Sequence, residues 1–314
     1  MLPSLLHCLQ APVEAESVES ATEWVQHWRG WAAEGWPAFE LALRAGFAAD
    51  RVAWAFAGGY QAALRAMAPA IADGVIVTLC ATEQGGNQPR DIQTTVTPDG
   101  AAVRLNGRKR WSTLAPVASH LLVVAIDGSD EARAAAAAKG HPVLRLVRVA
   151  TSTPGVLIQT MAATAFAPEV PHAEIELQAI GVTRGDVLPG DGFAQYLKPF
   201  RTAEDLFVNA ACLAYLIREA RAHRWPSALI EAQLSALCAL GALSGQPFDS
   251  PAVHLSLAGT LDAAARIYEA VDALWPDASS SAPAERRWRR DRALFGVASS
   301  ARAQRTARAW SALS

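Results

Sequence analysis

The sequence has little of what marks a secreted, membrane-spanning or metal-binding chain. Its four cysteines lie far apart and none forms a C-x-x-C pair, so neither a disulfide framework nor a zinc site is indicated. Cys80, Cys212 and Cys238 sit in apolar segments and are expected to be buried, reduced thiols. No apolar run reaches the roughly 20 residues that a membrane span needs. The N-terminus lacks the basic region of a signal peptide, so a cytoplasmic protein is expected.

Charge of one sign and common catalytic motifs are also missing. With 28 basic and 30 acidic residues, the formal net charge is −2, which predicts no general attraction to nucleic acid or to an anionic membrane. The chain contains no H-E-x-x-H or G-x-x-x-x-G-K-[ST] motif and no convincing Ser/His/Asp arrangement, and its seven histidines are scattered. No metal site is therefore expected.

The sequence does predict apolar helices toward both ends of the chain. The hydrophobic share of 51% predicts a globular protein with large buried helices. Trp24, Trp28 and Trp31 fall on one face of an early helix, where packing is favoured over a ligand site. Further helices are expected over residues 53–68, 203–222, 228–243, 253–274 and 285–312. The 203–222 segment is apolar on nearly all sides, as in the core of a bundle.

The last predicted helix, residues 285–312, carries eight arginines. Such a helix is able to bind the phosphates of coenzyme A or of a nucleic acid. A solvated face or a subunit contact is favoured instead, because the chain as a whole is not basic.

The middle of the chain predicts β-structure. Residues 75–81, 92–96, 121–126 and 143–149 have the apolar or alternating pattern of strands. Pro98-Asp99-Gly100 predicts a turn. Asn106-Gly107 is a strong two-residue hairpin signal, which predicts a separate strand after it.

The order of motifs in this stretch resembles the flavin-dependent acyl-CoA dehydrogenases. Thr82-Glu83, Leu105-Asn106-Gly107-Arg108-Lys109 and Trp111-x-Thr113 match, in order and spacing, the family's T-E-P-x-x-G-S-D loop and its N-G-R-K-x-W-I-T strand. The resemblance implies an α+β fold with truncated N-terminal helices over residues 1–73. A middle β-sandwich or β-barrel domain would follow over residues 74–192, and a C-terminal helical bundle over residues 193–314.

The resemblance also implies an FAD site. The strand end at Cys80 and Thr82 would contact the pyrimidine edge of the flavin, Trp111 would cover a ring face, and Thr113 would lie beside flavin N5. As purely structural alternatives, Trp111 is a core aromatic at a sheet edge and Thr113 a hairpin hydroxyl. Trp225 stands where the family's R-x-x-F-G motif has its aromatic residue.

Four departures from the family pattern bear on activity. The loop that approaches the phosphates includes Asn87 and Gln88 and is followed by Pro89, which removes an N–H donor. No arginine matches the R-x-x-F-G motif, and the family's Q-x-F-G-G segment is represented by residues 272–276, without glycine. The catalytic glutamate, eight positions after an Arg-Asp pair, is replaced by Ser299, which is no base for a C–H bond without an activating partner.

Glu204 is the candidate for a substitute base, since some family members carry their glutamate at the start of the first C-terminal helix. Acids that open a helix are also ordinary partners of its dipole. Two functions follow. The first is an FAD-dependent oxidoreductase acting on the CH–CH bond of an acyl-CoA-type thioester. The second is a catalytically inactive member that keeps the fold as a binding or structural partner. The family forms homodimers or homotetramers, which is the assembly expected here.

Overall fold

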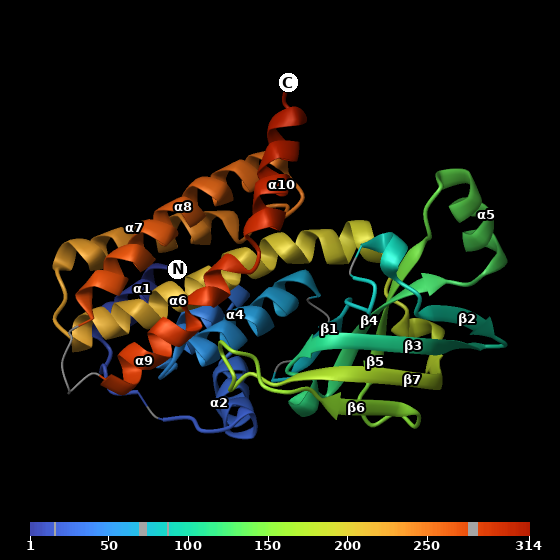
Figure 1. Cartoon of the computed structure of the whole chain (residues 1–314), viewed down its shortest axis with the longest axis horizontal. Helices are drawn as coiled ribbons and strands as arrows, with labels where there is room; N and C mark the ends of the chain where they lie inside the picture. Colours follow the sequence, from blue (N-terminus) through green and yellow to red (C-terminus); the bar gives the residue numbers. More distant parts are fainter. Residues whose placement is uncertain (16, 69–73, 87, 276–281) are drawn as a thin grey trace. The chain divides into compact units, whose positions relative to one another are not determined.

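The computed structural model describes residues 1–15, 17–68, 74–86, 88–275 and 282–314, which form two compact units (Figure 1). One unit comprises residues 1–74, 164–169 and 200–314, and the other residues 75–163 and 170–199. The mixed helical and β architecture confirms the predicted α+β fold. In the described parts of the chain, no helix is long and apolar enough to cross a membrane, and no group of three acidic, histidine or cysteine side chains is placed to hold a metal.

The first unit is helical. Its helices are α1 (Leu2–Gln10), α2 (Ala21–Ala33), α3 (Ala38–Ala48), α4 (Val52–Met67), α6 (Lys198–Ala222, from Phe200 onward), α7 (Ser227–Leu243), α8 (Pro251–Leu274), α9 (Ala282–Asp291) and α10 (Ser299–Ser311). Trp24 and Trp28 are buried and stack at 5.6 Å, which confirms that this face packs. Helix α4 approaches α6 closely at Gly59, where a Cβ would lie 2.5 Å from the Cα of Val208.

Two sequence predictions about this unit were wrong: the single helix over residues 285–312 and the burial of Cys238. The segment 285–312 is not one helix, because a 3-10 turn over Arg292–Gly296 separates α9 from α10. Six of its arginines (Arg287, Arg289, Arg290, Arg292, Arg302 and Arg305) pair with acids of the same unit; Arg292, for example, lies 2.9 Å from Asp272. Cys238, expected to be buried, is exposed on α7.

The second unit is built on a seven-stranded sheet. Its strands are β1 (Val77–Cys80), β2 (Thr95–Asp99), β3 (Ala102–Thr113), β4 (His120–Asp127), β5 (Leu144–Ala150), β6 (Val156–Thr160) and β7 (His172–Thr183), with α5 (Asp130–Lys139) between β4 and β5. The order is β1-β4-β2-β3-β7-β6, with β5 paired to β4. Because β1 and β2 pair with successive parts of β4, the end of β1 lies near the centre of the sheet.

The predicted hairpin at Asn106-Gly107 does not form. Strand β3 runs through both residues, and the hairpin to β2 turns earlier, around Gly100. The pair instead marks a register shift against β7, where the Asn106 side chain accepts a hydrogen bond from the Ala179 N–H at 2.7 Å. Glycine is needed at position 107 because a Cβ there would collide with Thr94.

A buried ion pair joins the loop after β1 to β3. One oxygen of Glu83 accepts hydrogen bonds from Lys109 Nζ at 2.6 Å, Thr94 Oγ1 at 2.7 Å and the Thr94 N–H at 3.1 Å, and the other accepts from the Gln93 N–H at 2.8 Å. Burial alone raises the pKa of the Glu83 carboxyl, but the Lys109 ammonium and the Thr94 donors outweigh it and hold that pKa below its usual range. The carboxylate is therefore a structural element of the unit.

Glu83→Gln should lower the free energy of unfolding by about 3–5 kcal/mol, because it leaves the fully buried Lys109 ammonium without its counter-charge. Urea denaturation measures the change. Glu174→Gln is the matched control, since the Glu174–Arg110 pair is partly exposed and its loss should cost about 1 kcal/mol or less. Adding Lys109→Met to Glu83→Gln should restore much of the loss. A cost for Glu83→Gln as small as that of the control would contradict this role.

Candidate functional site

Thr82, Trp111 and Thr113 lie on two neighbouring segments, the chain just after β1 and the last residues of β3. Two hydrogen bonds show that these segments run antiparallel, with Thr82 beside Arg110 and Thr113 beside Thr78. The Arg110 N–H donates to the Thr82 carbonyl at 2.9 Å, and the Thr78 hydroxyl donates to the Thr113 carbonyl at 2.6 Å. We call Thr82, Trp111 and Thr113 the strand-end platform.

The indole of Trp111 is exposed and held from two sides. Its side chain lies at a register shift in β3, with φ +56°, and 46% of the residue surface is exposed. The Arg110 guanidinium lies 5.5 Å from the ring centroid, and His172 meets the ring edge-on at 6.0 Å. A positive φ outside glycine costs on the order of 1 kcal/mol, so the surrounding contacts must hold this residue in place.

His172 is a site residue that the sequence did not indicate. It opens β7 and pairs with Thr113 across the sheet. Burial lowers its pKa, which favours the neutral imidazole at neutral pH. Only the pairing of β3 with β7 brings it to Trp111, and no sequence motif marks that register.

The polar groups of the platform differ in availability. The side-chain hydroxyls of Thr82 and Thr113 have no recorded hydrogen-bond partner in the parts of the chain that the structure describes, and both residues are half-buried. The Cys80 thiol, in contrast, is fully buried in the sheet core, and burial raises its pKa to about 11. Only the backbone of Cys80 is therefore suited to contact a ligand.

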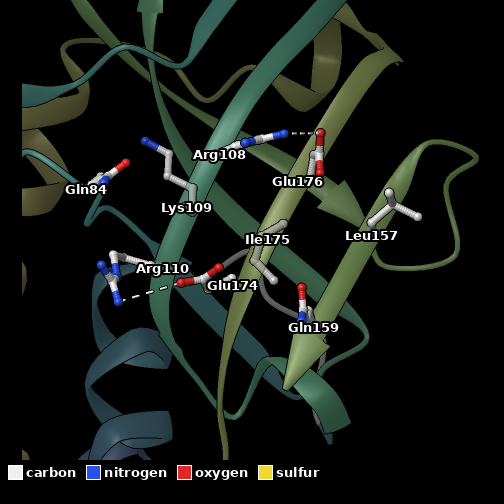
Figure 2. Close-up of a pocket in the computed structure, with 9 residues that line it drawn as sticks. All are labelled: Gln84, Arg108, Lys109, Arg110, Leu157, Gln159, Glu174, Ile175 and Glu176. Atoms are coloured by element: carbon white, nitrogen blue, oxygen red, sulfur yellow. Dashed lines mark hydrogen bonds and ion pairs between the residues drawn. The ribbon is translucent and has the colours of Figure 1, made fainter. Parts of the chain in front are cut away.

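Beside the platform, a hollow of about 550 Å³ lies over β3, β7 and β6 (Figure 2). Its lining residues are Gln84, Arg108, Lys109, Arg110, Leu157, Gln159, Glu174, Ile175 and Glu176. Arg108 pairs with Glu176 at 2.9 Å and Arg110 with Glu174 at 3.6 Å, as Figure 2 shows. The Nε of Arg110 is buried and has no hydrogen-bond partner among the residues that the structure describes.

The glycine-rich loop after β1 is closed on itself. Glu83 and Gly86 exchange backbone hydrogen bonds at 2.8 and 3.1 Å. The Gln88 N–H donates to the Asp91 carboxylate at 3.0 Å, at the start of the 3-10 turn Pro89–Asp91. Its backbone amide is therefore engaged within the chain and faces a negative charge. Asn87, the other loop residue expected to contact a cofactor, lies outside the described residues.

Glu204 lies in the first part of α6, half-buried. Burial and, second, the neighbouring Asp205 carboxylate raise the pKa of its carboxyl to about 7, against the opposing effect of Arg302 and Arg201. Asp205 is buried and ion-paired with both Arg302 and Arg305 at 2.7 Å. Of these two adjacent acids, Glu204 is therefore the one available to exchange a proton near neutral pH.

Within one chain, Trp225 lies far from Glu204. The residues are 21 positions apart across α6, which at about 1.5 Å per residue is roughly 30 Å. Trp225 is 8% exposed and packs against His223 at 5.6 Å and Trp275 at 5.0 Å.

The Arg290-Asp291 pair has a structural role. Asp291 is fully buried and accepts a hydrogen bond from the Ala167 N–H at 2.7 Å, and Arg290 pairs with Glu169 at 2.9 Å. Together they fasten the segment 164–169 to the helical unit. Ser299, eight positions further on, is exposed at the start of α10, where no carboxylate replaces the family's base.

Comparisons with known proteins agree with this architecture. Residues 78–180 match the family model described as acyl-CoA dehydrogenase, middle domain. No curated protein sequence matches the chain.

Three solved structures share the fold at low identity. The butyryl-CoA dehydrogenase of Megasphaera elsdenii is 14% identical with a TM-score of 0.65, covering 92% of this chain and 88% of that one. The prolyl acyl carrier protein oxidase AnaB is 15% identical with a TM-score of 0.64, covering 94% and 92%. The FAD complex of PigA is 14% identical with a TM-score of 0.64, covering 98% and 92%. The chain therefore contains a domain that matches the acyl-CoA dehydrogenase middle domain, and it shares the fold of these three structures.

Proposed function

We propose that the protein is an FAD-dependent oxidoreductase that acts on the CH–CH bond of an acyl thioester. The strand-end platform carries this proposal, because an exposed indole beside unengaged hydroxyls suits a flat heteroaromatic ring with polar edges. The names of the structural neighbours add support. They include an acyl-CoA dehydrogenase, an oxidase of an acyl group on a carrier protein, and an FAD complex.

The chain fits the two ends of FAD unequally. At the ring end, Trp111 offers a face, and Thr82 and Thr113 offer hydroxyls. At the phosphate end, the Gln88 amide is engaged by the Asp91 carboxylate, which repels a pyrophosphate. The platform would therefore hold the flavin ring, with less help from this loop for the phosphates.

Within this function, Glu204 is the proposed base. When bound, FAD would accept the hydride from the β-carbon. The chain's own task is then to take the α-proton, which moves to the Glu204 carboxylate and leaves it as a neutral carboxyl. A carboxyl with a pKa of about 7 is well matched to that exchange at neutral pH.

The second candidate function is a catalytically inactive member that keeps the fold as a binding partner. The closed loop at Gln88 and the absence of a carboxylate at Ser299 favour it. Under this alternative, the platform would hold no flavin. Glu204 would only interact favourably with the helix dipole at the start of α6.

Trp111→Ala should weaken FAD binding about tenfold or more, because the ring loses its aromatic contact. Titration of the purified, flavin-free chain with FAD, followed by flavin fluorescence, measures the affinity. Trp310→Ala is the matched control, since Trp310 is an exposed tryptophan on α10, outside the platform, and its loss should leave the affinity unchanged. Equal affinities of the two variants would remove Trp111 from the site, and no binding by the parent chain would support the inactive alternative.

Glu204→Gln should retain FAD yet slow its reduction by an acyl thioester at least 100-fold, because the amide takes up no proton. Anaerobic bleaching of the flavin absorbance measures the rate. For the parent chain, the rate should rise with pH through about 7 as the Glu204 carboxyl becomes ionised. An unchanged rate of flavin reduction in the variant would exclude Glu204 as the base. If the FAD-loaded parent chain shows no bleaching at all, the dehydrogenase proposal is contradicted.

We also propose that the chain forms a homodimer or homotetramer through α7 and α8. An apolar groove of about 760 Å³ runs along these helices, lined mainly by small side chains such as Ala232, Ala263 and Ala270 with Leu229 and Ile267. Small residues allow helices of a second copy to approach closely, and burying such a groove is favourable.

Ala270→Arg should shift the solution mass toward the monomer, because it places a second cation beside Arg266 in the groove. Light scattering coupled to size-exclusion chromatography gives the mass. Ala265→Arg is the matched control: this alanine is also exposed on α8 but does not line the groove. A monomeric parent chain, or equal masses of parent and Ala270→Arg, would contradict the proposed surface.

A further inference from the structure

Asp205 follows Glu204 on α6 and is held by two arginines of α10. Its carboxylate is 6% exposed, with one oxygen 2.7 Å from Arg302 and the other 2.7 Å from Arg305. Both arginines are themselves anchored, since Arg302 donates to the Phe295 carbonyl at 2.8 Å and Arg305 to the Arg201 carbonyl at 3.3 Å. The result is a rigid carboxylate next to a carboxyl that has no ion pair among the described residues.

We propose that Asp205, Arg302 and Arg305 form a positioning clamp that sets the charge around the Glu204 carboxyl and so supports its role as the base. The inference rests on the proposed role of Glu204. Asp205 acts through Glu204 and contacts no substrate in this account, so it is a positioning residue.

The clamp works by setting the charge around Glu204. The charged groups in this cluster are Arg201 and Asp205 of α6 and Arg302, Arg305 and Arg308 of α10. Without Asp205, Arg302 and Arg201 would lower the pKa of Glu204 with less opposition. The Asp205 carboxylate, held between Arg302 and Arg305, offsets part of this charge and, together with burial, raises that pKa to about 7.

The two arginines of the clamp have separable effects. Arg302 acts directly on Glu204 and lowers its pKa, whereas Arg305 is not among the causes of that shift and bonds to Asp205 and to the Arg201 carbonyl. Removing either breaks one 2.7 Å pair with the same carboxylate. Arg302→Gln and Arg305→Gln are therefore a matched pair that separates electrostatic tuning of Glu204 from simple loss of a contact between α6 and α10.

The test is a pH titration of the full chain labelled with ¹³C at the glutamate carboxyls, with the Glu204 resonance identified by its absence in Glu204→Gln. Asp205→Asn should lower the pKa of Glu204 by about one pH unit, and Arg302→Gln should raise it by a similar amount. Arg305→Gln should shift it by less than half as much as Arg302→Gln, and Asp205→Glu should restore the parent value.

Shifts of the same sign for Asp205→Asn and Arg302→Gln, or no shift in either, would overturn the clamp. If Asp205→Asn fails to fold, the Arg302→Gln and Arg305→Gln pair still decides, since equal shifts contradict the proposal. The titration needs neither FAD nor turnover, so its outcome is distinct from that of the flavin-reduction assay. Where the parent reduces flavin, the inflection of its pH–rate profile should move with the same signs.

Discussion

The buried contact between Glu83 and Lys109 is the constraint on which the β unit depends. It fixes the loop after β1 against β3. The Glu83 carboxylate also accepts hydrogen bonds from the backbone N–H groups of Gln93 and Thr94. A carboxylate and an ammonium that are buried away from water are tolerated only when they pair with each other and further hydrogen bonds complete the pair. Because Thr82 precedes Glu83 and Arg110 follows Lys109, the same contact places both sides of the strand-end platform.

The sequence predicted the architecture well, because the signals for it are local. The apolar and alternating runs correspond to strands β1, β2, β4 and β5, and Trp24 and Trp28 of the predicted tryptophan face of α2 are buried, whereas Trp31 is partly exposed. The Thr82-Glu83 and Trp111-x-Thr113 motifs also mark segments that the fold brings together. Two motifs in a fixed order and spacing indicate which segments pair with each other, whereas a single short pattern does not.

What the sequence did not predict depends on contacts between distant segments. Asn106-Gly107 has the composition of a hairpin, yet the approach of Thr94 and the pairing with β7 make it a register shift within a strand. The sequence shows eight arginines over residues 285–312 but not that acids such as Asp205 and Asp272 pair with several of them. The contact of His172 with Trp111 joins residues 61 positions apart, and the contact of Arg302 with Asp205 joins residues 97 positions apart. No local pattern encodes either contact.

The central claim is that the β unit presents a ready-made surface for a flavin ring. A crystal structure of the chain grown with FAD tests it most directly. The account predicts an isoalloxazine ring against the Trp111 indole, with its polar edge within hydrogen-bond distance of the Thr82 and Thr113 hydroxyls. A structure in which the protein's own side chains fill that space, with no flavin at Trp111, would contradict it.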